Sequence, residues 1–297
     1  MIYINDLPNG IVSKVRLFAD DTLLYLTVNT PEDLVTFQND LDSIDNWCKK
    51  WQMSLNYDKC EIMHIYSGRE KENFDFKLGG FSLSYTDSYK YLGVHIHDRL
   101  KWDKHIEETV NKAKRTLFVV KKVLRKSRPN VKKLAYFSLV RPLLEYASSV
   151  WDPSQVGQIH SIEMIQRMAA RFCTNRFGYN DSVSSMIEEL GWSSLSSRRY
   201  GNRLSLFSAV YSRKNGLSDL SQQLQKGNYF SRKDHSEKVA EIKCNKNVGH
   251  FSFLPRSVRD WNCLPNEFIK NLAINDQQKV RESLLKFSQS TANVRFY

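Results

Sequence analysis

The stretch VRLFADDTLLYL, residues 15–26, places two adjacent aspartates, Asp20 and Asp21, inside an otherwise apolar run. The flanking residues predict two short strands within Lys14–Val28, joined by a tight turn with the aspartates at its tip. Two neighbouring carboxylates repel each other, and a buried charge without a partner is costly. The pair therefore favours a bound cation, while a plain polar turn stays open because turns also enrich aspartate for local hydrogen bonding.

The next segment, NTPEDL, predicts the start of a helix. Thr30 is placed as the cap, Pro31 occupies the first helical position and Asp33 stands in the capping-box position. Apolar residues then recur every three or four positions, which predicts a helix over 31–51 with one buried stripe. The stripe consists of Leu34, Phe37, Leu41, Ile44, Trp47 and Trp51. Such a helix covers one face of a sheet.

The residues up to about 100 continue as an α+β pattern. A turn around 56–59 is followed by a predicted strand, Cys60–Tyr66, and then by a meander of short strands with a Gly79-Gly80 turn. His95 and His97 alternate along one of these strands, but two histidines without a third ligand do not predict a metal site.

Beyond residue 100 the chain reads as helical. Two helices are predicted, Lys104–Lys126 and Val131–Trp151, with Pro129 breaking the chain between them. More helices follow, one of which has an apolar face made of Ile159, Ile162, Ile165, Met168 and Phe172. We therefore expect three parts: 1–100, 101–155 and 156–297.

The composition is that of a globular protein, with 297 residues, 41% hydrophobic and 26% charged. The formal net charge of +12 favours a polyanionic partner, with nucleic acid ahead of an anionic membrane surface.

Most of the excess positive charge lies between Lys101 and Arg141, where 13 Lys and Arg face three acidic residues. A solvated helix face is the alternative reading of this run. The candidate nucleic-acid-binding residues are Lys112, Lys114, Arg115, Lys121, Lys122, Arg125, Lys126, Arg128, Lys132 and Lys133. Trp102, beside them, is a candidate for base stacking.

The remaining signals concern compartment and metal. Five widely spaced cysteines without a CxxC pair indicate reduced thiols. No run of 18 apolar residues and no signal-peptide pattern occurs, so we expect a cytoplasmic or nuclear protein without a membrane partner. The opening residues, IYIND, read as the start of an interior fragment. A zinc site is not expected, because the spacings of His235, Cys244, His250 and Cys263 are irregular.

Taken in order, five segments resemble reverse transcriptases of non-LTR retrotransposons of the jockey-like or LINE type. All five lie in the first hundred residues: IYINDLP, LFADDT, the amphipathic helix that follows it, NYDKCEIM and YKYLGVHI. FADD, residues 18–21, is similar to the family's catalytic box in the palm. LVRPLLEYASSVW and FLPRSVRDWNCLP are similar to the thumb and C-terminal region. The resemblance thus spans nearly the whole chain.

The resemblance implies a fold and an activity. The fold would be α+β: a partial palm, then a mainly helical thumb and C-terminal domain. The activity would be RNA-directed DNA polymerisation, with an RNA template, a DNA primer or RNA/DNA duplex, deoxynucleoside triphosphates and a two-metal Mg²⁺ site. Asp20 would bind metal directly and Asp21 would support the site. Lys59 would act near the leaving pyrophosphate, with a solvated turn lysine as the alternative that stays open. Tyr91, Leu92 and Gly93 would belong to the strand pair that grips the primer.

One part of the family's site is missing from this sequence. The family supplies a further metal-binding aspartate and the fingers from upstream of its FADD box, and nothing before Asp20 replaces them. We therefore expect a truncated polymerase that is inactive alone. Two alternatives stay open: a non-catalytic RNA- or DNA-binding module built on the basic helices, and a gene remnant without function.

Overall fold

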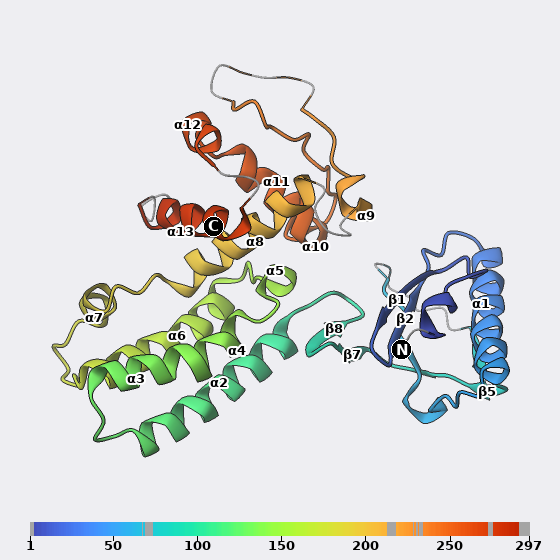
Figure 1. The fold of residues 1–297 in the computed structure, drawn as a ribbon, viewed down its shortest axis with the longest axis horizontal. Helices are drawn as coiled ribbons and strands as arrows, with labels where there is room; N and C mark the ends of the chain where they lie inside the picture. The colour runs from blue at the N-terminus through green and yellow to red at the C-terminus, as the bar shows by residue number, and fades with distance from the viewer. Residues whose placement is uncertain are drawn as a thin grey trace. The chain divides into compact units, whose positions relative to one another are not determined.

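The computed structural model describes residues 3–66, 68, 74–212, 218–227, 229, 231, 234–272 and 276–290. It divides into two compact units, Met1–Leu100 and Lys101–Tyr297 (Figure 1). The first combines short strands with one long helix and the second is helical, so the α+β class is confirmed. None of the helices in the described ranges is long and apolar enough to span a bilayer.

The first unit contains the predicted hairpin. After a 3₁₀ turn, Tyr3–Asp6, strand β1 (Lys14–Phe18) pairs with β2 (Asp21–Tyr25) in antiparallel register. Phe18 lies opposite Asp21, so the turn between the strands holds only Ala19 and Asp20. The prediction of a tight turn with the aspartates at its tip is confirmed.

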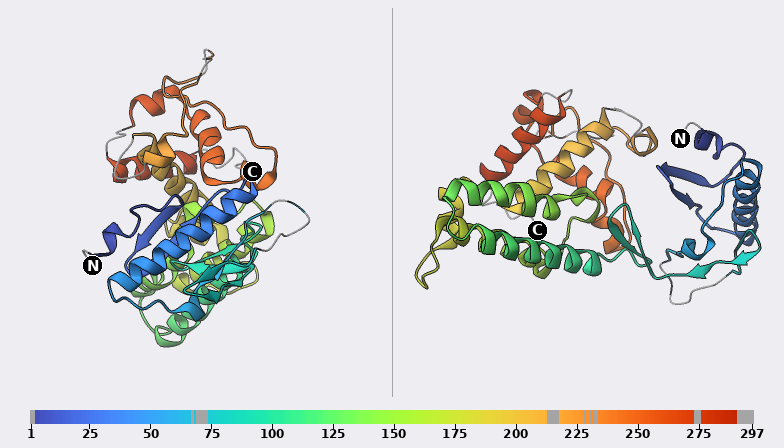
Figure 2. Two further views of the ribbon diagram at one scale, coloured as in Figure 1. Left: turned by 90° about the vertical axis from the view of Figure 1, so that its right-hand side faces the viewer. Right: turned by 60° about the horizontal axis from the view of Figure 1, so that its bottom comes forward.

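Helix α1 (Pro31–Lys50) begins and ends close to the prediction. The Asp33 carboxylate accepts hydrogen bonds from the backbone N–H groups of Asn29 at 2.8 Å and Thr30 at 2.9 Å, which satisfies donors at the helix start. Figure 2 shows α1 as one continuous helix. Trp51 caps its end and is 40% exposed, so this residue falls outside the buried stripe that the spacing predicted.

The other strands of the first unit are very short. They are β3 (Glu61–Ile62), β4 (Lys77–Leu78), β5 (Phe81–Ser82), β6 (Ser84–Tyr85), β7 (Ser88–Tyr91) and β8 (Val94–His97). With β1 and β2 they form four two-stranded sheets in the described residues, and β3 pairs with β6 in parallel. The predicted strand Cys60–Tyr66 shortens to two residues, because its partner β6 offers only two residues for the ladder. The Gly79-Gly80 turn between β4 and β5 is as predicted.

Two apolar clusters hold the first unit together around α1. In one, Ile44 and Cys48 pack with Leu7 and with the inward side chains of the β1–β2 hairpin. In the other, Leu41 packs with Phe76 and Leu78 beside β4. The single helix therefore supports both the hairpin and the later strands.

The second unit is built from helices. They are α2 (Asp103–Val123), α3 (Pro129–Ala135), α4 (Arg141–Glu145), α5 (Ser148–Trp151), α6 (Val156–Thr174), α7 (Val183–Glu189), α8 (Leu195–Tyr211), α9 (Ser218–Ser221), α10 (Asn247–His250), α11 (Phe253–Asn262), α12 (Asn266–Lys270) and α13 (Gln277–Ser290). Helices α2, α4 and α6 lie side by side, and α13 packs along α8 (Figures 1 and 2).

Two helix boundaries differ from the prediction. Pro129 occupies the first position of α3, where its missing N–H costs nothing, so it begins a helix. The predicted single helix Val131–Trp151 passes through a π-helical segment, Tyr136–Val140, and stops after Glu145, where Ala147 adopts φ 51°. In α6 the expected apolar face is confirmed, with Ile162 and Ile165 fully buried.

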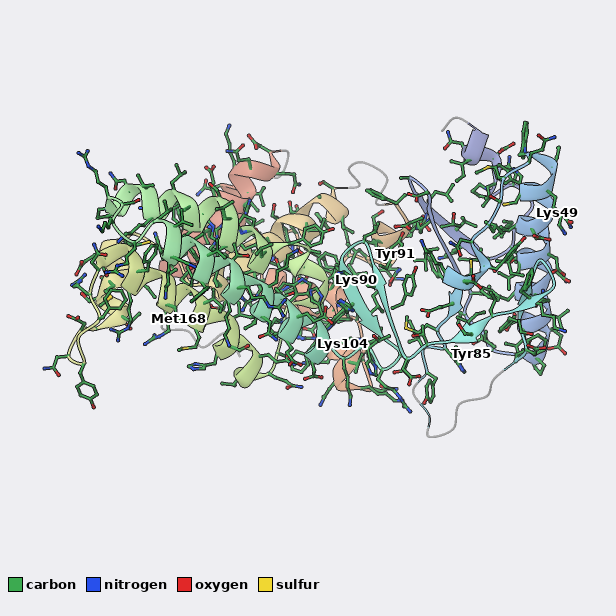
Figure 3. All side chains as sticks on the ribbon, turned by 90° about the horizontal axis from the view of Figure 1, so that it is seen from below. Lys49, Tyr85, Lys90, Tyr91, Lys104 and Met168 are labelled. Carbon is green, nitrogen blue, oxygen red and sulfur yellow. The ribbon has the colours of Figure 1, made fainter. Side chains whose placement is uncertain are left out.

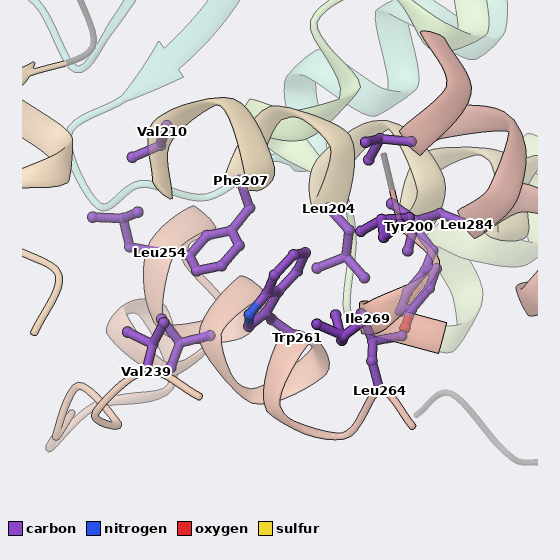
Figure 4. Close-up of a cluster of buried hydrophobic side chains, with 13 residues drawn as sticks. Tyr200, Leu204, Phe207, Val210, Val239, Leu254, Trp261, Leu264, Ile269 and Leu284 are labelled. Carbon is purple, nitrogen blue, oxygen red and sulfur yellow. The ribbon is translucent and has the colours of Figure 1, made fainter. Parts of the chain in front are cut away.

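The C-terminal helices share one core. Trp261 of α11 is fully buried and packs against Phe207 of α8, with ring centroids 5.5 Å apart (Figure 4). Leu204, Val258 and Leu284 join this cluster from α8, α11 and α13. Burying so many large apolar side chains stabilises this part of the unit without any sheet.

Candidate functional site

Asp20 and Asp21 stand at the tip of the β1–β2 hairpin, where both carboxylates are exposed. The carboxylates are therefore not buried as expected, and because water solvates both groups, burial alone does not demand a cation. The turn itself is strained: Ala19 has φ 55°, a conformation that costs a residue with a Cβ about 1–2 kcal/mol. Strain of this kind persists where the surrounding structure over-determines it.

Asp40 fixes the segment that leads into the hairpin. Its buried carboxylate accepts hydrogen bonds from the backbone N–H of Val12 at 3.0 Å and of Ser13 at 2.7 Å. Carboxylates that accept backbone bonds make strong, charge-assisted contacts. Sequence reasoning missed Asp40, although an acidic residue next to the buried stripe of α1 was its available signal.

The hairpin β7–β8 holds one side chain, Tyr91, within electrostatic reach of Asp21. Tyr91 and its neighbour Lys90 lie on this hairpin (Figure 3), whose two-residue turn holds Leu92 at φ 46° and Gly93 at φ 81°. Burial raises the pKa of the Tyr91 phenol above its ordinary value, and the negative charge of Asp21 raises this pKa further. The structure thus brings the FADD box and the expected primer-gripping strand pair into one neighbourhood.

Arg16 of β1 completes that neighbourhood. Its positive charge lowers the pKa of Tyr91, against the effects of burial and Asp21. Its guanidinium also lies 5.9 Å from the ring centre of Tyr25 on β2. A basic side chain beside exposed aspartates suits a site that meets phosphate groups.

Lys59 ends a short 3₁₀ turn, Tyr57–Lys59, and is exposed. The turn is held by the hydroxyl of Tyr57, which donates to the buried carboxylate of Asp45 at 3.1 Å. In the part of the chain that the structure describes, no ion pair joins Lys59 to Asp20 or Asp21. The expected role of Lys59 near the leaving pyrophosphate stays a prediction.

The donor set around Asp20 and Asp21 is too small for a two-metal site. Mg²⁺ takes six oxygen ligands, and a pair of such ions is held by several carboxylates. Within the described ranges, no group of three or more His, Cys, Asp or Glu side chains could hold a metal ion. The aspartate pair fits as a contribution to such a site and does not fit as the whole of it.

The basic stretch in the second unit presents most of its charges to solvent. Helix α2 buries Ile106, Val110, Ala113, Leu117 and Val120, so its opposite face is free to carry charge. The exposed basic residues are Lys112, Lys114, Arg115, Lys122, Arg125, Lys126 and Arg128, which we call the α2 basic surface. Phe118 is 69% exposed among them.

Three of the ten predicted basic residues are not on that surface. Lys132 is buried: its ammonium group donates to Asn175 Oδ1 and lies 4.6 Å from the ring centre of Phe172. Lys133 is half-buried and donates to the carbonyl of Leu190 at 3.0 Å. Lys121 is half-buried, and burial lowers its pKa. Lys132 is removed from the candidate set, because helix packing takes up its charge.

The remaining sequence candidates have ordinary structural surroundings. Trp102 is half-buried against His105. His97 lies with Nδ1 2.6 Å from Asp98 Oδ1, and His95 sits opposite Lys90. His235 is buried, with Nε2 2.9 Å from the carbonyl oxygen of Trp261. Cys244 Sγ contacts the carbonyl of Ile242 at 3.6 Å.

Comparison with known proteins places these features in context. Residues 1–96 match the model of the family described as reverse transcriptase (RNA-dependent DNA polymerase). A Drosophila melanogaster protein named "Probable RNA-directed DNA polymerase from transposon BS" is 26% identical over 166 residues, which cover 53% of this chain and 18% of that protein. No solved structure matches the chain.

Two further relatives are RNA-directed DNA polymerases of the mobile element jockey. The Drosophila funebris protein is 27% identical over 184 residues, covering 57% of this chain and 20% of its own length. The Drosophila melanogaster protein is 25% identical over 163 residues, covering 53% and 18%. The chain thus spans about a fifth of these relatives. Since each matched region exceeds 100 residues, the similarity extends beyond the first unit.

Proposed function

Because residues 1–96 belong to the reverse transcriptase family and the chain is related to jockey-type non-LTR elements, we propose that it is part of an RNA-directed DNA polymerase. In this proposal the first unit supplies Asp20 and Asp21 to the polymerase site. The observation that carries it is the hairpin tip, which exposes both carboxylates beside Tyr91. Its partners are an RNA template, a DNA primer and deoxynucleoside triphosphates, with Mg²⁺ as the cofactor.

These 297 residues by themselves do not polymerise. Nucleotidyl transfer needs charge neutralisation at both the attacking and the leaving oxygen. The aspartate pair alone cannot hold two ions, and the described residues bring no third acidic, His or Cys side chain to it. The chain then acts only together with groups that complete the site.

A primer-extension assay tests this. The purified chain is incubated with a primed RNA template, all four deoxynucleoside triphosphates and Mg²⁺, beside Asp20→Asn and the control Asp58→Asn, which changes an exposed aspartate outside the FADD box. We expect no extension from any of the three proteins. Extension by the unchanged chain and by Asp58→Asn, lost in Asp20→Asn, would show that the site is complete and overturn the proposed inactivity.

The second unit binds nucleic acid through the α2 basic surface. Seven exposed basic residues lie in one short part of the chain, and the opposite face of α2 is fixed in the core. Each phosphate contact releases counterions, so the binding constant falls with salt by about 0.9 log unit per contact for a DNA duplex. Phe118 adds an aromatic ring that can contact a base or sugar.

Fluorescence anisotropy with a labelled RNA/DNA duplex at several salt concentrations measures this contribution. The triple variant Lys122→Gln, Arg125→Gln and Arg128→Gln should weaken binding and reduce the salt slope by about three. The matched control Lys226→Gln, Lys243→Gln and Lys270→Gln removes the same charge from exposed positions elsewhere in the unit. If both triple variants weakened duplex binding equally, the binding would depend on net charge alone, and the assignment to the α2 basic surface would be wrong.

A non-catalytic nucleic-acid-binding module is the second candidate function. It is favoured by the separate packing of the second unit, in which α2 buries its apolar face against α6 and α4 without the aspartates. Adding the missing polymerase segments in trans distinguishes the two. Restored extension that depends on Asp20 supports the polymerase; duplex binding without any restored extension supports the module.

A further inference from the structure

A second group of charges lies far along the chain from the basic helix. A cavity of about 260 Å³ opens between the start of α8, the α5–α6 connection and helices α10 and α11. Its charged walls, which we call the arginine pocket, are Asp152, Arg199, Arg203, Arg256, Arg259 and Asp260. Asp152 directly follows LVRPLLEYASSVW, and three of the others belong to FLPRSVRDWNCLP or its surroundings. The nucleic-acid-binding surface of α2 uses none of these residues.

Asp152 organises the pocket. Its carboxylate accepts from Arg199 Nε at 2.9 Å and from Arg203 Nη1, and Arg256 Nη1 donates to its backbone carbonyl at 2.9 Å. Arg203 also reaches Asp260 through Nη2. Arg199 and Arg203 are only 1% and 2% exposed, so their positions are set by packing.

The positive charges outnumber their partners. Four arginines face two aspartates, which leaves two positive charges uncompensated in a confined space. Burial lowers the pKa of Arg256, and the like charge of Arg203 lowers it further, against the pull of Asp152. Like charges held this close in a low-dielectric site are costly unless an anion joins them.

The hydrogen bonds are also incomplete. Among the described residues, Nη1 of Arg199 and Nε of Arg203 are buried and have no hydrogen-bond acceptor. Buried donors are nearly always paired, and leaving a charged one unpaired costs more than leaving a neutral one. Both arginines line the cavity that holds the charge excess, but these two nitrogens lie beneath its surface, so it is the excess of positive charge that calls for an oxygen-rich anion.

We propose that the arginine pocket binds a phosphomonoester, a phosphate group with two negative charges. Guanidinium groups match phosphate oxygens in bidentate geometry, and two negative charges balance the excess of the pocket. The volume is below the roughly 300–1,000 Å³ of pockets for larger ligands, which suits one phosphate group. Such a group occurs at the 5′ end of a nucleic-acid strand and on a free nucleotide.

Calorimetric titration of the full chain tests the shared chemistry. Deoxyadenosine 5′-monophosphate should bind and uncharged deoxyadenosine should not. Arg259→Gln should weaken the monophosphate about tenfold or more, because one charge-assisted hydrogen bond is lost. Arg259 is the suitable position, since its described bonds go to His250 and none goes to Asp152. Equal affinity for nucleoside and nucleotide, or no change in Arg259→Gln, would overturn the proposal.

A second variant distinguishes loss of nucleotide binding from loss of folding. Ser197 lines the cavity at the third position of α8, where an acidic residue favours the helix. Ser197→Asp should therefore keep or raise the melting temperature while it abolishes nucleotide binding by occupying the pocket with a carboxylate. The control Lys270→Gln, at an exposed position on α12, should leave binding of the monophosphate unchanged. Unchanged binding in Ser197→Asp would contradict the assignment.

The source of the phosphate is found with two oligonucleotides that differ only at the end. Tighter binding of a 5′-phosphorylated strand than of its 5′-hydroxyl form, lost in Arg259→Gln, assigns the pocket to strand ends. Equal binding of the two strands, together with binding of the monophosphate, assigns it to a free nucleotide. The result is independent of the α2 basic surface, whose triple variant weakens both strands alike and leaves the monophosphate unaffected.

Discussion

The backbone of Ala19 is the feature of the hairpin tip that a single substitution can test. Its φ of 55° is relaxed for glycine and strained for alanine. Ala19→Gly should raise the free energy of unfolding of the first unit by about 0.5–1 kcal/mol, because relief of strain exceeds the added entropy of the unfolded chain. Urea unfolding followed by circular dichroism measures this difference.

The matched control is Ser43→Gly, which introduces glycine at an exposed position inside α1. It should lower stability by about 0.5–1 kcal/mol, because the helix interior disfavours glycine. If Ala19→Gly destabilised the unit as much as the control does, the hairpin tip would carry no strain that glycine relieves.

The phenol of Tyr91 reports whether Asp21 is its neighbour in solution. Its pKa is raised, first by burial and then by Asp21, so Asp21→Asn should lower the pKa part of the way toward the ordinary value. Because the pKa of Tyr91 is higher in the folded than in the unfolded chain, the protonated phenol stabilises the fold. This contribution is complete below about pH 10 and is lost as the pH rises through the folded pKa.

Carbon-13 NMR of the tyrosine Cζ atoms over a pH series reads out this change. Tyr91→Phe assigns the resonance, and Asp58→Asn serves as the control for an exposed charge outside the FADD box. If the pKa of Tyr91 were unchanged in Asp21→Asn, Asp21 of the FADD box would not be a neighbour of Tyr91 on the β7–β8 hairpin in solution.

The residues of the site were only partly readable from the sequence. Asp20 and Asp21 were found because adjacent acids interrupt an apolar run, a local pattern. Asp40 and the pocket residue Arg199 lie in helices, and the groups they bind are 28 and 47 residues away. Lys132 was misplaced for the same reason, since its burial depends on α6 and the residues after it. Local periodicity carries no information about such distant partners.

At the scale of elements, Glu145 joins three helices of the second unit. The Glu145 carboxylate accepts two hydrogen bonds from Arg198 of α8, one from Nε and one from Nη2 at 2.9 Å. It also lies within 4 Å of Arg141 of α4 and Arg281 of α13. The Glu145 side chain is 13% exposed, so solvent screens it little. Glu145→Gln should destabilise the second unit by about 2–4 kcal/mol, because three arginines lose their shared counter-charge.

Thermal unfolding of the full chain tests this, with Glu188→Gln as the control at an exposed position in α7. The control should leave the melting temperature nearly unchanged. If Glu145→Gln lowered the melting temperature no more than Glu188→Gln does, the three arginines would be solvated or paired with other groups in the variant.

Elements with strong periodicity were the predictable ones. The start of α1 followed from Thr30, Pro31 and Asp33, and the apolar face of α6 from its spacing. The π-helical segment Tyr136–Val140 left no such trace in the apolar spacing; within it Tyr136 stacks on Trp192 at a ring distance of 4.7 Å, a partner far along the chain. Strand β3 stopped short because a strand extends only as far as its partner allows.

For the whole molecule, the two units differ in what holds them together. The first relies on two small clusters around α1 and on sheets of two strands, while the second has a large core around Trp261. A two-stranded sheet is marginal in water and leaves edges unpaired. Phe18, the last residue of β1, is 60% exposed, and Val12, just before β1, is 71% exposed. These exposed apolar side chains add to the tendency of the first unit to aggregate.

Limited trypsin digestion of the full chain should therefore remove residues 1–100 first and leave a longer-lived fragment that begins near Lys101. Asp40→Ala, which unpairs the N–H groups of Val12 and Ser13, should speed the loss of the first unit and leave the lifetime of the fragment unchanged. Glu145→Gln should shorten the lifetime of the fragment and leave the first unit unaffected. Mass spectrometry of the time course identifies the products. Simultaneous loss of both units, accelerated alike by either substitution, would show that the chain unfolds as one cooperative body.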